Sequence, residues 1–294
     1  MIKVLFSTTR KPYYFPEKWD ELTPEQLTAL IEIVMTEQDN HTAKLLILRE
    51  WMKLPRQQFA DMVLQKKYEE SKQINHFFIA EVEEKLLPFL DPFLEYGGFE
   101  VNIMKKLIVP GLRKETLIGF SDRMESISAD EYSHASHFYQ LYIDEPNDLS
   151  NLHRFVACLY RPQRKDGILP GHPDYNGDMR SPFNAGNIDF IAAKVAKIAP
   201  LKLHAVKLCF ERIMKWLSEL ENYEYVFKGD PDKSADYVDW DKIIRMVAGD
   251  KLGSLEQVRK LPILGVFQEL QYLEEDLRAA ESTSPSHTAK YQEL

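Results

Sequence analysis

The sequence is poor in cysteine and in glycine. Among its 294 residues are two cysteines, Cys158 and Cys209, and 12 glycines. Two cysteines cannot form the disulfide framework of a small secreted domain, and a collagen-like repeat needs glycine at every third position. Both cysteines lie in apolar stretches, which indicates buried, reduced thiols in a reducing compartment.

Long apolar runs and an excess of positive charge are also missing. No run of about 18 apolar residues occurs, so no segment is expected to span a membrane. The apolar stretch in residues 1–7 is too short for a secretory signal. With 37 basic and 46 acidic residues the net charge is −9, whereas nucleic-acid binding needs a concentrated positive surface. We therefore expect a cytoplasmic protein with neither a nucleic-acid nor a membrane partner.

The common catalytic motifs are absent as well. The sequence has no P-loop, dinucleotide-binding, nucleophile-elbow, HExxH or CxxC pattern. Glu131 and His134 form a single Glu-x-x-His pair, but a carboxylate di-metal site needs such pairs on two helices, so an ordinary half-exposed helix face is expected. The acidic run from Asp174 has Met179 and Ala185 where a calcium loop needs glycine and glutamate. We expect no catalytic residue, no metal and no cofactor.

Apolar residues recur at helical spacing through most of the chain. Short extended runs in the first 22 residues predict an N-terminal β-hairpin, and the stretches 99–103 and 107–109 predict a second minor β element near 99–109. The fold class is therefore mainly α, a multi-helix, bundle-like body with these small β elements. The spacing predicts a helix that begins at Thr23 and further helices at about 41–54, 56–70, 71–87, 128–143, 148–159, 187–198, 200–221, 240–249 and 254–280.

Proline, glycine and capping residues mark the boundaries. One body is expected over residues 1–280, with a soft division between 88 and 127, and a flexible, polar tail over 281–294. Pro262 predicts a dent in the last helix. A hydroxyl followed three residues later by glutamine or glutamate predicts capping boxes at three helix starts, those of Thr23, Ser128 and Ser254.

Residues 161–183 form the longest stretch without a helical pattern, with four prolines and three glycines. Loops beyond about 12–15 residues are usually functional or disordered. Apolar side chains among mixed charges are typical of a protein interface, which predicts a functional lid or a docking loop. The pattern is equally compatible with side chains that pack back on the body. The candidate partner-binding residues are Ile168, Leu169, Tyr175, Met179, Arg180 and Phe183.

Trp19 and Leu22 precede the first helix. An apolar residue just before the cap, here Leu22, can pack on the fourth residue of the helix, Leu27, as a hydrophobic staple. Because aromatic side chains dominate cores as well as interfaces, we expect Trp19 to hold the extended N-terminal arm on the first helices.

Three parts of the sequence resemble a family of bacteriophage and prophage proteins. They are residues 15–26, FPEKWDELTPEQ; 159–162 with 177–183, LYRP and GDMRSPF; and 240–248 with 258–267, WDKIIRMVA and VRKLPILGVF. Here the chain is similar to the tail-assembly-chaperone-like proteins of tailed phages. The resemblance implies a non-enzymatic assembly factor in the host cytoplasm that binds a tail component such as the tape-measure protein.

Two alternatives stay open at the level of the sequence. One is a structural subunit of a phage particle, and the other is an enzyme with an unrecognised site around 131–180. An assembly factor should remain a small soluble species, whereas a particle subunit should form rings or larger objects. A bound metal would favour the enzyme.

Overall fold

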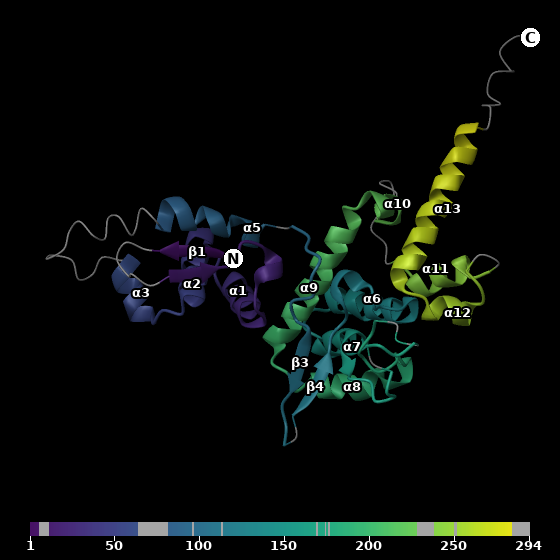
Figure 1. Ribbon diagram of the computed structural model, residues 1–294, viewed down its shortest axis with the longest axis horizontal. Helices are drawn as coiled ribbons and strands as arrows, with labels where there is room; N and C mark the ends of the chain where they lie inside the picture. Colours follow the sequence, from purple (N-terminus) through teal and green to yellow (C-terminus); the bar gives the residue numbers. More distant parts are fainter. Residues whose placement is uncertain are drawn as a thin grey trace, which may run out of the picture. The chain divides into compact units, whose positions relative to one another are not determined.

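The fold is mainly helical, with 62% of the described residues in helices, a two-stranded antiparallel sheet at the N-terminus and a small three-stranded sheet (Figure 1). This confirms the predicted fold class. None of the described helices has both the length and the apolar content that a membrane span requires. The structure, a computed structural model, describes residues 1–5, 12–63, 82–95, 97–112, 114–168, 170–173, 175, 177–227, 238–249 and 252–283.

The chain divides into two compact units. Unit 1 comprises Met1–Lys105 and Ile198–Ile213, and unit 2 comprises Lys106–Lys197 and Met214–Leu294. The long helix α9 (Pro200–Ser218) contributes its first part to unit 1 and its last residues to unit 2. Each unit is described separately below.

Unit 1 begins with the predicted hairpin. Strands β1 (Ile2–Leu5) and β2 (Pro12–Phe15) pair antiparallel, and the first residue of β1 lies opposite the last residue of β2. Tyr13 and Phe15 are buried and Tyr14 between them is exposed, the alternation expected of a strand with one face on a core. The hairpin prediction is confirmed.

Three helices follow: α1 (Pro24–Thr36), α2 (Asn40–Met52) and α3 (Arg56–Val63). The capping box at the start of α1 is confirmed. The Thr23 hydroxyl accepts a hydrogen bond from the Gln26 backbone N–H at 3.2 Å, and the Gln26 side chain accepts one from the Thr23 N–H at 3.0 Å. Because Pro24 has no N–H, this helix start has three orphan donors, and two of them are thereby satisfied.

The apolar face of α1 is shorter than its spacing predicts. Leu27, Leu30 and Ile31 are buried, but Val34, one turn further, is 48% exposed. Of the predicted helices at 56–70 and 71–87, the parts over 64–81 lie outside the described residues.

Trp19 is buried and holds the N-terminal arm, as expected, but on other elements than the sequence predicts. Its indole Nε1 donates to the Pro92 carbonyl at 3.1 Å. Its ring lies 5.5 Å from that of Phe93 and stacks on Phe99 at 5.3 Å. The Arg212 guanidinium of α9 lies 5.4 Å from the same ring. Trp19 thus connects the arm to the chain at 92–99 and to α9.

The predicted strand at 99–103 is wrong. Phe99 and Asn102 are buried, but the backbone there is irregular. The Asn102 side chain accepts a hydrogen bond from the Met104 N–H at 3.1 Å, and the Phe99 N–H donates to the Arg212 carbonyl of α9 at 3.3 Å. These contacts take backbone groups that a strand ladder would use. Before this stretch lie a short π-helix (Val82–Leu86), a 3₁₀ turn (Pro88–Leu90) and the short helix α5 (Asp91–Leu94).

Unit 2 opens with the second sheet. Strand β3 (Lys106–Val109) confirms the prediction at 107–109 and pairs antiparallel with β4 (Glu115–Ile118), which pairs antiparallel with the two-residue strand β5 (Arg161–Pro162). The sequence does not predict β4 or β5. Because β5 begins the 161–183 segment, this sheet fixes the point where that segment leaves the helices.

Helix α7 (Leu149–Leu159) packs on both α6 (Ala129–Asp144) and α8 (Ile188–Val195). The apolar stripe predicted for α7 is confirmed, and all of its members are fully buried: Leu152, Phe155, Val156 and Leu159. The remaining 3₁₀ turns of the described chain are Trp19–Glu21, Asp122–Met124, Ala185–Asn187 and Glu221–Tyr223.

The C-terminal helices pack around Phe267, which is fully buried. The rings of Tyr132, Trp240 and Phe227 lie 5.3, 5.2 and 5.3 Å from its ring. Residues 284–294 of the predicted tail lie outside the described residues. The C-terminal helices are α10 (Glu224–Phe227), α11 (Trp240–Val247), α12 (Leu255–Lys260) and α13 (Ile263–Thr283).

Pro262 divides the last predicted helix instead of denting it. Leu261 has an extended backbone, with φ −66° and ψ 150°, because the following proline disfavours the helical conformation. The break contacts the start of α6: the Ala129 N–H donates to the Leu261 carbonyl at 2.9 Å, and the Ile263 N–H donates to the Ile127 carbonyl at 2.8 Å. The prediction of one continuous helix over 254–280 is therefore wrong.

Candidate functional site

The two ends of the 161–183 segment pair with each other at the edge of the small sheet. Gln163 and Arg180 form an isolated antiparallel bridge. The Arg164 N–H donates to the Met179 carbonyl at 3.0 Å, and the Ser181 N–H donates to the Pro162 carbonyl at 2.8 Å. The segment is therefore a closed loop with a hydrogen-bonded base.

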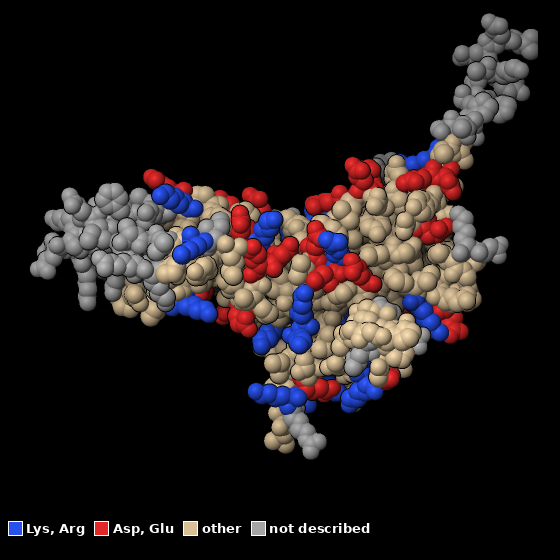
Figure 2. Space-filling model, viewed as in Figure 1, with Lys and Arg blue, Asp and Glu red and all other residues tan. Residues whose placement is uncertain are grey.

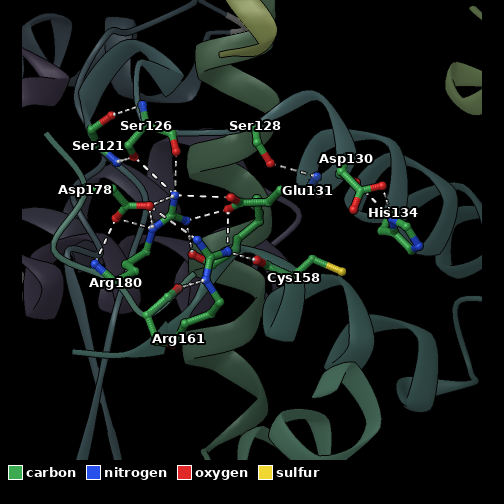
Figure 3. Close-up of polar contacts among 12 residues, drawn as sticks. Ser121, Ser126, Ser128, Asp130, Glu131, His134, Cys158, Arg161, Asp178 and Arg180 are labelled. Atoms are coloured by element: carbon green, nitrogen blue, oxygen red, sulfur yellow. Dashed lines mark hydrogen bonds and ion pairs between the residues drawn. The ribbon is translucent and has the colours of Figure 1, made fainter. Parts of the chain in front are cut away.

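A buried ionic cluster holds this base against α6 and α7 (Figure 3). Glu131, on the first turn of α6, is 1% exposed and forms an ion pair with Arg180. The Arg180 guanidinium also donates to the Leu159 carbonyl at 2.8 Å, to the Ser126 carbonyl at 2.9 Å and to Asp178 Oδ1 at 2.9 Å. This one side chain thus joins the segment to two helices and to the turn before α6.

Arg161 supplies the second guanidinium of the cluster. Its Nη1 lies 3.0 Å from Glu131 Oε1 and donates to the Cys158 carbonyl at 2.8 Å. Its Nε donates to the Ser181 carbonyl at 2.7 Å, and its Nη2 donates to Asp178 Oδ2 at 3.3 Å. Two guanidinium groups therefore face two carboxylates, and the buried charges balance.

The cluster keeps Arg180 charged although it is buried. Burial by itself lowers the pKa of Arg180, but Glu131 and Asp178 outweigh it and raise the pKa above its usual value. Buried charges are tolerated when they are paired and hydrogen-bonded, and here each guanidinium meets both conditions. Arg180, a candidate partner-binding residue on the sequence alone, lies in the interior.

Glu131 also corrects two predictions for the start of α6. The Ser128 hydroxyl accepts from the Glu131 N–H at 3.2 Å, which is half of the predicted capping box, but the Glu131 carboxylate lies in the cluster. The face is not half exposed at Glu131, although His134 is partly exposed, with its Nδ1 2.8 Å from the Asp130 carbonyl. Glu131 and His134 thus have separate partners. No group of three or more potential metal ligands occurs among the described residues.

A cavity of about 570 Å³ lies beside the cluster. Its lining comes from the start of α6, the 161–183 segment and α12, and it carries five basic and five acidic side chains. Two of its basic groups have ion pairs of their own: Arg259 with Asp241 at 2.7 Å and Lys260 with Glu256 at 2.8 Å. Because its charges balance, the cavity does not favour ligands of one sign.

The other candidate residues lie in different surroundings. Ile168, Tyr175, Met179 and Phe183 are partly buried, whereas Leu169 lies outside the described residues. Phe183 packs back on the body, since its ring lies 5.5 Å from the His134 ring and 5.5 Å from the Arg161 guanidinium. Asp174, the start of the weak calcium-like pattern, lies outside the described residues, and Asp178 at its end binds the two arginines.

Both thiols are buried, as the sequence predicts. Burial raises the pKa of Cys158 well above its usual value, and the nearby Glu131 carboxylate adds to this effect. Burial raises the pKa of Cys209 to about 12. A nucleophilic cysteine needs a lowered pKa and access to substrate, so these two residues serve as core packing.

Sequence reasoning missed the partners of the cluster. Arg161 and Arg180 were visible as basic residues of a loop, and Glu131 as the third residue of a helix, but no local spacing connects them. No protein-family model, no curated protein and no solved structure matches this chain.

Proposed function

We propose that this protein is a non-enzymatic, protein-binding assembly factor of bacteriophage type, which acts in tail assembly by binding a tail component such as the tape-measure protein. The resemblance to tail-assembly-chaperone-like proteins motivates the partner class. The docking surface proposed is the 161–183 segment.

The observation that carries the proposal is the way in which this segment is held. Its base is closed by backbone hydrogen bonds and by the Arg161–Arg180–Glu131–Asp178 cluster, and its apolar residues Ile168, Tyr175 and Met179 remain partly exposed. A segment whose ends are already ordered loses less conformational entropy on binding than a free one. Partly exposed apolar groups beside charged ones suit the centre and rim of a protein interface.

The state of the ionisable groups favours binding over catalysis. The carboxylates and guanidinium groups of the cluster are engaged with each other, so these four charged groups of the cavity lining are committed to structure. General acid–base catalysis needs a group within reach of substrate with a pKa near the working pH. Neither buried thiol meets that condition, since burial raises both pKa values.

The test replaces only residues 167–176 with a glycine-serine bridge, because Asp178 and Arg180 belong to the cluster and must stay. The altered and the intact protein are each co-expressed with the tail proteins encoded near the gene, and the complexes are recovered by pull-down. We expect the altered protein to keep its helicity and melting temperature but to lose the partner that the intact protein recovers.

Two outcomes would contradict the proposal. Unchanged recovery of the partner would show that residues 167–176, with Ile168 and Tyr175, are not the docking surface. Rings or larger objects in light scattering of the purified protein would favour the alternative of a particle subunit, because an assembly factor should remain a small soluble species.

A further inference from the structure

The apolar stripe of α13 passes from the interior to the surface toward the end of the helix. Val266 is fully buried, Leu270 and Leu273 are partly buried, and Leu277 is 59% exposed. Ala280, the next member of the stripe, is exposed. The steps of four, three, four and three residues keep all five on one helix face. Figure 1 shows the second half of α13 running away from the other helices of unit 2.

Acidic residues border this stripe. Residues 269–280 contain four acidic side chains and one arginine, which gives 1 − 4, or −3. At 100° per residue, Glu269 and Asp276 fall on one side of the stripe and Glu274 on the other. Arg278 already has two partners in the protein. Its Nε pairs with Glu274 at 3.1 Å, and its guanidinium lies 4.1 Å from the Tyr225 ring. Acidic side chains are visible along this end of the molecule in Figure 2.

The negative charge beside the stripe indicates which partner can cover it. A second copy of the chain would place −3 against −3 across the contact, and like charges beside a helix seam oppose pairing. A helix with lysine or arginine beside its apolar stripe would cover the leucines and neutralise the acidic borders. We propose that Leu273, Leu277 and Ala280 of α13 dock a basic amphipathic helix of a partner protein.

This inference goes beyond the proposed function, because it concerns a different element and names the chemistry of the partner. The exposed stripe covers about two helical turns, so the apolar contact is small and the charges contribute much of the attraction. Exposed charges are screened by salt, over about 10 Å at 0.1 M. Binding should therefore be weak and should become weaker as salt is added.

The experiment measures binding of a synthetic amphipathic peptide to the full-length protein by fluorescence anisotropy. The peptide has about three heptads, leucine at positions a and d, and lysine at e and g. A second peptide with the same leucines carries glutamate at e and g. We expect the lysine peptide to bind at low salt and the glutamate peptide not to bind.

Two variants separate the apolar stripe from charge alone. Leu277→Asp and Ala279→Asp each add one negative charge to the exposed end of α13, but only the first lies on the stripe. Loss of one buried leucine contact corresponds to about tenfold in affinity, so we expect Leu277→Asp to weaken binding about tenfold and Ala279→Asp not to weaken it. Circular dichroism and melting verify that both variants are folded.

Three results would overturn the inference. Equal binding of the lysine peptide to both variants would mean that only the negative charge attracts it. Equal binding of the glutamate peptide would remove the charge argument. A dimer in light scattering that disappears in Leu277→Asp would show that a second copy occupies the stripe.

Discussion

At the scale of single residues, Glu131 is the centre of the structure around the 161–183 segment. It binds Arg180 and Arg161, and with Asp178 it brings the buried charge to zero. A buried ion pair contributes little compared with well-packed apolar groups, but removing one partner is costly because a charge is left without compensation. The stability of unit 2 should therefore depend strongly on each member of the cluster.

Arg180→Leu tests this dependence. The substitution leaves two buried carboxylates for one guanidinium, so we expect the free energy of unfolding to fall by about 3–5 kcal/mol. Urea unfolding followed by circular dichroism gives the value. The matched control is Arg245→Leu, since Arg245 is 57% exposed and its pair with Asp241 lies on the surface of α11; it should cost less than about 1 kcal/mol. A similar loss in both variants would contradict the role of the cluster.

Asp241 makes the stability of the protein depend on pH. Hydrogen bonds from Arg245, and after it Arg259, lower the pKa of Asp241 below its usual value, against burial, which raises it. The unfolded value is about 3.9. A carboxyl whose folded pKa is lower contributes stability above the unfolded pKa, and this contribution is lost as the pH falls through the folded pKa.

Asp241→Asn should therefore be less stable than the unaltered protein at neutral pH, and the difference should shrink below about pH 4. Urea midpoints of both proteins from neutral to acidic pH test this. A difference that stays constant down to about pH 2 would assign the effect to shape and hydrogen bonding and not to charge.

At the scale of elements, identical local signals lead to different contacts. Thr23 and Ser254 both form complete capping boxes with the glutamine three residues later. Ser128 has the same pattern, but the Glu131 side chain is withdrawn from the cap by the two arginines. The reciprocal hydrogen bond of a capping box is a weak, solvent-accessible contact, so a buried ion pair displaces it.

Trp19→Ala tests how the N-terminal arm is held. Trp19 loses its contacts with Phe93, Phe99 and Arg212, and a large-to-small change of a buried aromatic costs about 3–5 kcal/mol. Tyr14→Ala is the control, because Tyr14 is an exposed aromatic of the neighbouring strand and should cost far less. Thermal melting of both variants gives the answer, and equal, small shifts would show that Trp19 does not hold the arm.

At the scale of the whole molecule, the chain does not form its two units in sequence order. Residues 198–213 return to unit 1 after unit 2 has begun, and the Arg212 backbone and side chain then bind Phe99 and Gly97. Frequent proline and glycine can indicate where one unit ends, but they cannot indicate which later helix completes it. That choice depends on which buried surfaces fit each other.

Several features follow from the sequence alone. The helical class, the N-terminal hairpin, the caps of α1 and α12, and the burial of Cys158 and Cys209 were all predictable. The helices and their caps depend on residues within about two helical turns of one another, and over such distances backbone geometry and capping chemistry largely decide the outcome. The two strands of the hairpin are close in sequence, with Ile2 opposite Phe15, and the two cysteines lie in apolar stretches. The strand at 99–103 was wrong because a contact with the distant Arg212 overrode the local pattern. The continuous last helix was wrong for a local reason, since Pro262 holds Leu261 in an extended conformation.

Only the tertiary structure decided the rest. Glu131 and Arg180 are 49 positions apart, and nothing in the spacing of either residue shows that they pair. The same holds for β4 and β5, and for the end of α13, where the stripe keeps its spacing but Leu277 is exposed. Local spacing shows which face of an element is apolar; packing determines which partner covers that face, and where the covering ends.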